Sequence, residues 1–146
     1  AASVLAGLSL VSNYDEPLII DLADIYFQSK LPKIFNESTS SIISLPVFKS
    51  KSPKYSYIDY ELSSNQILSV AEKKVISPFA STGVYIFSSA LVYLSLASRG
   101  FGSNSDSLYN DIFYISPLLN YIDDDSRSSV ELLECSSFLD LSPCNS

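Results

Sequence analysis

The chain has 146 residues, of which 47% are hydrophobic and 17% are charged, a composition that excludes an intrinsically disordered protein and predicts one globular domain spanning residues 1–146. A formal charge of −7 argues against nucleic acid and anionic membranes as partners, because both favour clustered Lys and Arg. The absence of histidine excludes a Ser-His-Asp triad and His-containing zinc sites, so any chemistry must rely on carboxylates, lysines, hydroxyls and metal ions.

The first part of the chain predicts a helix followed by a strand. Residues 1–11 carry apolar side chains at helical spacing. They begin without Met and without a positively charged stretch, so we expect the chain to start inside a longer protein and not at a secretory signal. Residues 18–20 form a continuous apolar run that ends at Asp21, as in a strand buried on both faces of a mainly parallel sheet. The polar turn after such a strand is where open α/β sheets bind ligands.

The middle of the chain predicts a further strand and a hairpin. Residues 42–48 are strand-like, and Pro46 makes this an edge strand or a bulged one, because proline cannot donate to the ladder. Residues 55–61 and 66–71 flank a polar turn and form a hairpin signal. We expect the tyrosines of the hairpin, at positions 55, 57 and 60, to serve cross-strand packing and not an aromatic binding platform.

An uncharged stretch over residues 75–98 raises the alternative of a membrane span. Pro78, Gly83 and many hydroxyl residues interrupt it, so a buried strand over 82–87 and a packed helix are the better interpretation. Ser88 or Ser89 would cap this helix, which runs to Arg99 and stops at Gly100.

The last part predicts a short helix over 116–122, a solvated turn over 123–129 and a final strand over 130–134. Three aspartates in the turn lack the ligand spacing of a calcium loop. Cys135 and Cys144 are too few for a disulfide framework or a four-thiolate metal site, and we expect free thiols in a cytoplasmic protein. Strands mixed with helices predict an α/β three-layer domain with some antiparallel pairing.

Several short segments resemble the sugar-phosphate nucleotidyltransferases, or nucleotide-sugar pyrophosphorylases, and they follow one another along the chain in the order of that family. The most specific is Glu72-Lys73 followed, after a short spacer, by Thr82-Gly83 and a hydrophobic residue with Tyr. The other segments are 15–24, 53–58, 110–120 and 138–142, of which 53–58 resembles members from capsule and lipopolysaccharide biosynthesis.

The resemblance implies a fold and an activity. The fold is a three-layer, Rossmann-like nucleotide-diphospho-sugar transferase domain with a mixed sheet and a β-hairpin insertion. The chain would be N-terminally truncated, lacking the glycine-rich loop and the other groups that hold the nucleotide. The family joins a sugar 1-phosphate to a nucleoside triphosphate and releases pyrophosphate, a reaction that positioning and charge neutralisation can drive without a protein nucleophile. Because the nucleotide-holding groups would be missing, we expect the truncated chain alone to be inactive. The oligomeric state stays open, with a homo-oligomer as one alternative.

The resemblance also implies the site residues. Asp24 and Asp140 would be ligands of a Mg²⁺ cofactor, with Asp24 at the end of the buried strand. Lys73 would supply charge to the sugar phosphate, and Glu72 would accept hydrogen bonds from sugar hydroxyls. Thr82 and Gly83 would contact the substrate, since glycine allows its close approach to the backbone. Asp24 and Lys73 are thus the predicted catalytic residues.

Simpler interpretations of the same residues stay open. Asp24 suits a turn or helix cap, the charges at 72 and 73 suit a solvated strand end, and Gly83 suits a bulge. Two departures from the family, Lys74 for proline and Ser142-Pro143 for Gly-Thr, favour the alternative of a non-catalytic binding or regulatory module of the same fold.

Overall fold

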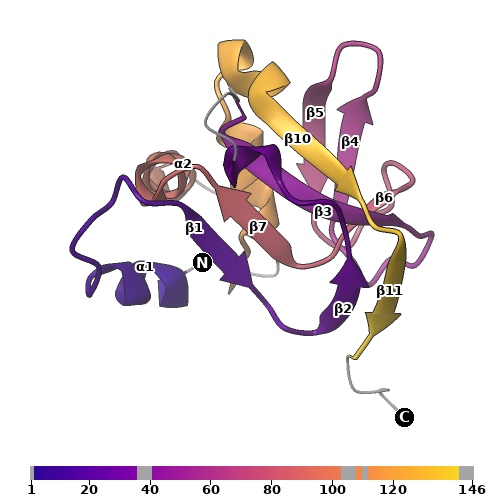
Figure 1. Ribbon diagram of the computed structural model, residues 1–146, viewed down its shortest axis with the longest axis horizontal. Helices are drawn as coiled ribbons and strands as arrows, with labels where there is room; N and C mark the ends of the chain where they lie inside the picture. The colour runs from indigo at the N-terminus through magenta and orange to yellow at the C-terminus, as the bar shows by residue number, and fades with distance from the viewer. Residues whose placement is uncertain (1, 36–40, 103–107, 110–111, 142–146) are drawn as a thin grey trace.

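A computed structural model describes residues 2–35, 41–102, 108–109 and 112–141 (Figure 1). The helices are α1 (Ala2–Leu8) and α2 (Ala90–Gly102), with 3₁₀ helices η1 (Lys33–Phe35), η2 (Ser116–Tyr121) and η3 (Asp124–Ser129). The strands are β1 (Leu18–Asp21), β2 (Ile25–Gln28), β3 (Ile43–Lys49), β4 (Tyr57–Glu61), β5 (Gln66–Ala71), β6 (Phe79–Ser81), β7 (Val84–Phe87), β8 (Leu108–Tyr109), β9 (Ile112–Phe113), β10 (Val130–Glu134) and β11 (Ser137–Asp140).

The main sheet has seven strands in the order β1-β7-β3-β6-β4-β5, with β10 paired to β3. Only the β10–β3 pairing is parallel among the pairings that the described residues make. The expectation of a mainly parallel sheet is therefore wrong, because β1 and β7 run antiparallel and β4–β5 is a hairpin. The broader prediction of an α/β domain with a mixed sheet is confirmed.

Strand β3 lies at the centre of the sheet, so the expectation that Pro46 marks an edge is wrong. Pro46 accepts a 3.1 Å hydrogen bond from the Thr82 amide through its carbonyl, and its nitrogen points to the same side of the strand. On that side the neighbouring strand is interrupted between β6 and β7. The missing proline donor thus faces a break in the ladder, where no acceptor of the neighbouring strand needs it.

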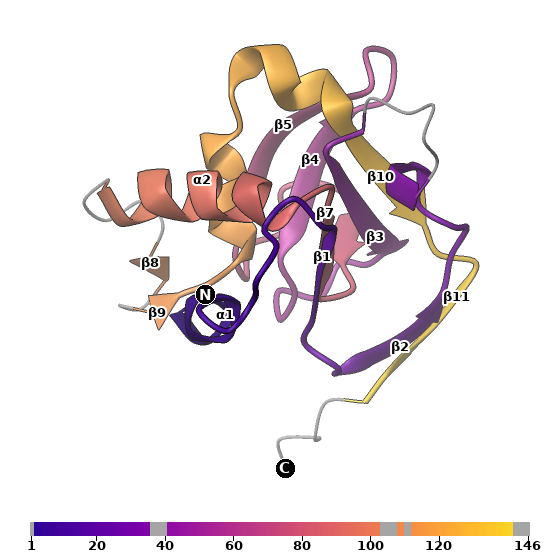
Figure 2. The same ribbon diagram turned by 60° about the vertical axis from the view of Figure 1, so that its left-hand side comes forward.

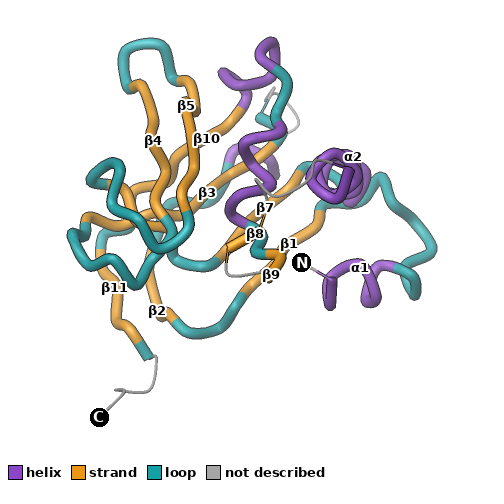
Figure 3. Tube along the Cα trace, turned by 180° about the vertical axis from the view of Figure 1, so that it is seen from behind, coloured by secondary structure: helices purple, strands orange, loops and turns teal. Residues whose placement is uncertain are grey.

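The core lies on both faces of β3. Val47 belongs to the main cluster, whereas the next residue, Phe48, belongs to a second cluster with Ile25 and Tyr57. Helices α2 and η2 contact each other and cover the main cluster (Figures 2 and 3). The β2–β11 ribbon borders the second cluster, where the Phe48 and Phe138 rings stack with centroids 4.1 Å apart. Burial on both faces, predicted for residues 18–20, is thus a property of β3.

Strand β1 is instead an edge strand of the sheet, in which Ile20 is buried and Ile19 is 55% exposed. The hairpin prediction is confirmed by β4 and β5, whose turn contains Asn65 at φ 53°, a conformation that asparagine tolerates. The uncharged stretch forms β6, β7 and the start of α2. No helix of the described residues is long and apolar enough to cross a membrane.

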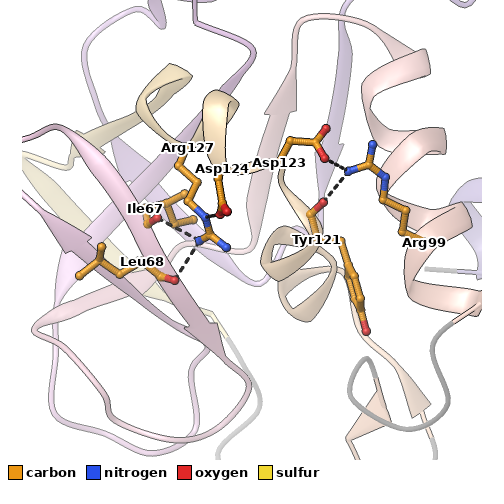
Figure 4. A network of polar contacts seen from close by, with 7 residues as sticks. All are labelled: Ile67, Leu68, Arg99, Tyr121, Asp123, Asp124 and Arg127. Carbon is orange, nitrogen blue, oxygen red and sulfur yellow. Dashed lines mark hydrogen bonds and ion pairs between the residues drawn. The ribbon is translucent and has the colours of Figure 1, made fainter.

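The segment predicted as a solvated turn is the 3₁₀ helix η3, and arginine fixes it to the sheet (Figure 4). Arg127 donates to the backbone oxygens of Ile67 (3.2 Å) and Leu68 (3.0 Å) in β5. Its Nε also contacts Asp124 at 2.8 Å. Arg99 of α2 donates to Asp123 and to the Tyr121 carbonyl, which ties α2 to the end of η2.

Candidate functional site

A pocket of about 270 Å³ lies beside the break between β6 and β7. Its walls come from five parts of the chain: the turn after β1, the segment before β4, the turn after β5, the β6–β7 segment, and the segment that leads into η2. The lining residues are Leu22, Asp24, Ile25, Lys54, Tyr55, Ser56, Glu72, Lys73, Ser81, Gly83, Tyr85, Tyr114, Ile115 and Ser116. The pocket therefore combines carboxylates, lysines and hydroxyls in one small volume.

Four of the six predicted site residues line this pocket: Asp24, Glu72, Lys73 and Gly83. They come from segments far apart in the sequence, so only the folded sheet brings them together. Thr82 and Asp140 do not line it.

The Glu72 carboxylate is held by two serine hydroxyls. Ser56 donates to Glu72 Oε2 at 2.5 Å, and Ser116 donates to the same oxygen at 2.6 Å. Ser116 is buried and the other two residues are half-buried. Tyr85 also lines the pocket, and burial is the chief cause that raises the pKa of its phenol, which therefore stays protonated. This arrangement differs from a solvated charge pair at a strand end, because Glu72 is bound by neutral hydroxyls and not by a lysine.

Lys73 is exposed at the rim of the pocket with a left-handed backbone, at φ 52°. Its Nζ lies 3.5 Å from the Tyr114 hydroxyl and 5.3 Å from the centre of that ring. A non-glycine residue in this conformation is uncommon and strained. The turn directs successive side chains, Glu72 and Lys73, to the same pocket.

Asp24 and Gly83 lie next to each other in the wall of the pocket. A Cβ atom on Gly83 would lie 3.2 Å from Asp24 Oδ1 and 3.3 Å from Leu22 Cβ, and Gly83 has φ 81°. Ala23, next to Asp24, also has a positive φ of 59°, and its amide donates to Asp21 Oδ1 at 2.7 Å. Among the described residues, the positive-φ positions other than Asn65 thus lie in or beside the pocket. The Asp24 side chain has no hydrogen bond or ion pair to a described residue.

Thr82 is 1% exposed and lies in the core. Its hydroxyl donates to the Pro46 carbonyl at 3.1 Å and accepts from the Val84 amide at 3.3 Å. The prediction that Thr82 contacts the substrate therefore disagrees with its position. The hydroxyl instead satisfies backbone groups at the break between β6 and β7, where the ladder is interrupted.

Asp140 lies on β11, paired with Ile25 in register, and the Leu141 amide donates to the Asp24 carbonyl at 2.8 Å. Asp140 at the end of β11 is thus next to the turn that contains Asp24, directly before β2. The Asp140 carboxylate, however, is bound by the Lys54 ammonium and by the Tyr55 hydroxyl. The hydrogen bond to Asp140 is the chief cause that raises the pKa of Lys54, so the ammonium stays charged.

The donor set suits Mg²⁺ only in part. The described residues contain no group of three or more acidic, cysteine or histidine side chains that could hold a metal ion. Mg²⁺ commonly uses one or two carboxylates together with substrate phosphates, so Asp24 fits as a protein ligand. Asp140 would have to exchange Lys54 for the ion.

Sequence reasoning missed several lining residues, namely Lys54, Tyr55, Ser56, Ser81, Tyr85, Tyr114 and Ser116. Tyr55 was expected only to pack within the hairpin, but it precedes β4 and lines the pocket. Tyr57 and Tyr60 do pack: Tyr57 is buried, and Tyr60 donates to the Val130 carbonyl at 3.0 Å. The available signal was that all of the missed residues except Ser81 fall within segments of the resemblance, although it assigns them no role.

Of the two thiols, Cys135 is free and half-buried, whereas Cys144 lies outside the described residues. Burial raises the pKa of Cys135 to about 11. This thiol is therefore inert near neutral pH and contributes nothing to the pocket.

Several solved structures have the same fold as this chain. No protein-family model matches the chain, and no curated protein matches it. A nucleoside-diphosphate-sugar pyrophosphorylase from Vibrio cholerae RC9 superposes with a TM-score of 0.68 at 20% identity, over 96% of this chain and 57% of that one.

Two further structures give the same result. A putative glucose-1-phosphate thymidylyltransferase from Bacillus anthracis matches with a TM-score of 0.65 at 16% identity, over 96% of this chain and 55% of that one. The inositol-1-phosphate CTP transferase from T. maritima has a TM-score of 0.57 at 12% identity, over 98% and 55%. The expected fold is confirmed, and the chain spans little more than half the length of these structures.

Proposed function

From the premise that the chain has the fold of sugar-phosphate nucleotidyltransferases, we propose that it is the C-terminal, sugar-binding part of such an enzyme. The enzyme would join a sugar 1-phosphate to a nucleoside triphosphate with release of pyrophosphate, for nucleotide-sugar and surface polysaccharide biosynthesis. The observation that carries the proposal is the meeting of Asp24, Glu72, Lys73 and Gly83 in one pocket. These residues come from three separate parts of the chain, so the fold and not the local sequence brings them together.

Each lining group has a role in binding the acceptor. Lys73 at the rim supplies a positive charge for the phosphate of the sugar, a point charge that needs no fixed geometry. Glu72 accepts hydrogen bonds from ring hydroxyls, and Gly83 leaves space above Asp24. The phosphate oxygen of the sugar then attacks the α-phosphorus of the nucleotide, and the bond to the departing pyrophosphate breaks.

Asp24 is the residue that would hold Mg²⁺ in this pocket, with Asp140 as a second ligand once Lys54 is displaced. When bound, the ion neutralises negative charge on the phosphates of both reactants. The Asp24 carboxylate can coordinate an ion without losing another contact, because it makes no hydrogen bond or ion pair with the described residues.

The test is pyrophosphate release by the full-length protein, supplied with Mg²⁺, nucleoside triphosphates and hexose 1-phosphates. Asp24→Asn removes the charge that holds the ion, so we expect at least about a 100-fold loss of rate. Asp125→Asn, which removes the same charge from the exposed η3 segment, is the matched control and should leave the rate within about twofold. Equal rates for Asp24→Asn and the unchanged protein would remove Asp24 from the mechanism.

The second candidate is a binding or regulatory module that takes the sugar phosphate without chemistry. The observation that favours it is the contact of Asp140 with Lys54 and Tyr55, which occupies a carboxylate the reaction would use. Binding of hexose 1-phosphate without pyrophosphate release, with every nucleoside triphosphate offered, would support this module and exclude the enzyme.

A further inference from the structure

We propose that Ser56 and Ser116 are positioning residues, which fix the Glu72 carboxylate so that one of its oxygens receives the hydroxyl groups of the sugar. The inference rests on the proposed function and adds two residues that the sequence resemblance does not assign. It begins from the two short hydrogen bonds to Glu72 Oε2, at 2.5 and 2.6 Å.

The three side chains come from three elements. Ser56 directly precedes β4, Glu72 directly follows β5, and Ser116 is the first residue of η2. Helix η2 is itself fixed to the sheet, because the Asn120 amide group donates to the Val70 carbonyl at 2.9 Å and accepts from the Val70 amide at 2.8 Å. Val70 lies two residues before Glu72, so this clamp also sets the distance from Ser116 to the carboxylate.

Both serine bonds end on the same carboxylate oxygen. An ionised carboxylate only accepts hydrogen bonds, so each serine hydroxyl must be the donor. The other oxygen, Oε1, accepts no hydrogen bond from the described residues. The two serines therefore restrict rotation of the Glu72 side chain and leave one acceptor for a ligand, and the rotational freedom is lost before the ligand arrives.

The surroundings of Glu72 define the class of ligand. Ser81 and Tyr85 add further hydroxyls to the pocket wall, and Lys73 stands at the rim. A carboxylate fixed by neutral donors is matched by neutral hydroxyl donors on the ligand, and the lysine is matched by an anionic group. A hexose 1-phosphate has both, whereas inorganic phosphate has only the group that suits Lys73.

The experiment measures two affinities of the chain by calorimetry, one for α-D-hexose 1-phosphates (glucose, galactose and mannose) and one for inorganic phosphate. In Ser56→Ala and Ser116→Ala we expect hexose 1-phosphate to bind about fivefold to tenfold more weakly, as for the loss of one charge-assisted hydrogen bond. Affinity for inorganic phosphate should change less than about twofold, because Lys73 is unaltered.

A matched control is Ser63→Ala. Ser63 also donates to a glutamate, Glu61, at 2.8 Å, but it lies in the exposed hairpin turn. This variant should bind both ligands as the unchanged chain does. Ser56→Thr keeps a hydroxyl and should restore most of the affinity for hexose 1-phosphate that Ser56→Ala loses.

The outcomes separate the positioning role from the function on which it rests. If the unchanged chain binds inorganic phosphate but none of the three sugar phosphates, the proposed function and the positioning role both fall. If it binds a sugar phosphate and the alanine variants bind it equally well, only the positioning role is overturned. Equal losses for sugar phosphate and inorganic phosphate would indicate a general structural role and would also overturn it. Should Ser116→Ala fail to fold because the residue is buried, the half-buried Ser56 decides the question alone.

Discussion

Gly83 connects the backbone of the sheet with the geometry of the pocket. Its φ of 81° is unfavourable for residues with a side chain, and an added Cβ would press against Asp24 and Leu22. We expect Gly83→Ala to lower the free energy of unfolding by about 1–3 kcal/mol and to displace the Asp24 carboxylate. Denaturant unfolding measures the first effect.

Gly7→Ala is the control for this substitution. Gly7 lies in α1 and an added Cβ would meet nothing within 4 Å, so alanine should be neutral or stabilising by up to about 1 kcal/mol. If Gly83→Ala were as stable as Gly7→Ala, the tight approach of Asp24 to Gly83 would be disproved.

Cys135 provides a prediction on pH. Burial raises the pKa of its thiol from 9.0 to about 11, which means that the folded state favours the neutral form. Its contribution to stability is present below pH 9 and is lost as the pH rises towards 11. Since only the thiolate reacts, iodoacetamide at pH 8 should modify Cys135 at least about tenfold more slowly in the native chain than in urea. Cys144→Ser would isolate the signal, and equal rates in both states would contradict the burial of this thiol.

The sequence predicts some of these residues better than others, for a physical reason. Glu72, Lys73 and Gly83 stand in the short pattern that resembles the nucleotidyltransferases, so the resemblance could propose them before the fold was known. Ser56 and Ser116 could not, because serine is abundant in the chain and its partner, Glu72, is distant in sequence. Thr82 shared the pattern of Gly83, but it lies in the break between β6 and β7, where its buried hydroxyl bonds to backbone groups of Pro46 and Val84.

At the scale of elements, local sequence patterns predicted which helices and strands form better than they predicted how the strands pair. The hairpin β4–β5 and helix α2 follow from turn and cap signals, and Ser89 accepts a 3.4 Å hydrogen bond from the Val92 amide as expected of a cap. An apolar run such as residues 18–20 does not show which strands will pair with it. Strand β1 was therefore expected inside the sheet, but it lies at the edge. Strands β2 and β11 are short, exposed in part and stabilised by each other, so neither carries a strong signal alone.

Arg127 is the contact that fixes η3 to strand β5 (Figure 4). Its guanidinium donates to two backbone oxygens that an edge strand would otherwise leave to water. We expect Arg127→Ala to lower the free energy of unfolding by about 1–2 kcal/mol, measured by denaturant unfolding. Lysine should not restore it, because its single ammonium cannot reproduce the planar geometry of the guanidinium.

Lys49→Ala is the control for Arg127. Lys49 pairs with Glu134 at 2.9 Å, but both side chains are more than half exposed, so its loss should cost at most about 0.5 kcal/mol. Equal effects of the two substitutions would show that η3 is not held by Arg127.

At the scale of the whole molecule, the order of short segments along the chain predicted the fold, although no segment is decisive alone. The sheet then does what no local pattern can: it brings the ends of β1 and β5 and the break between β6 and β7 to one pocket. The direction of the strands was not predictable, since side-chain alternation is the same in parallel and antiparallel sheets. In a chain of net charge −7, the pocket has two lysines among its lining residues, Lys54, which is paired with Asp140, and Lys73 at the rim.

The central claim is that this pocket binds the sugar phosphate. An NMR titration of the ¹⁵N-labelled chain with α-D-glucose, galactose and mannose 1-phosphates, one at a time, tests it most directly. At least one of them should shift the backbone amide signals of Ser56, Lys73 and Gly83 first and most. Signals from η3 and the hairpin turn should stay in place. No shift with any of the three, or shifts centred away from these residues, would contradict the claim.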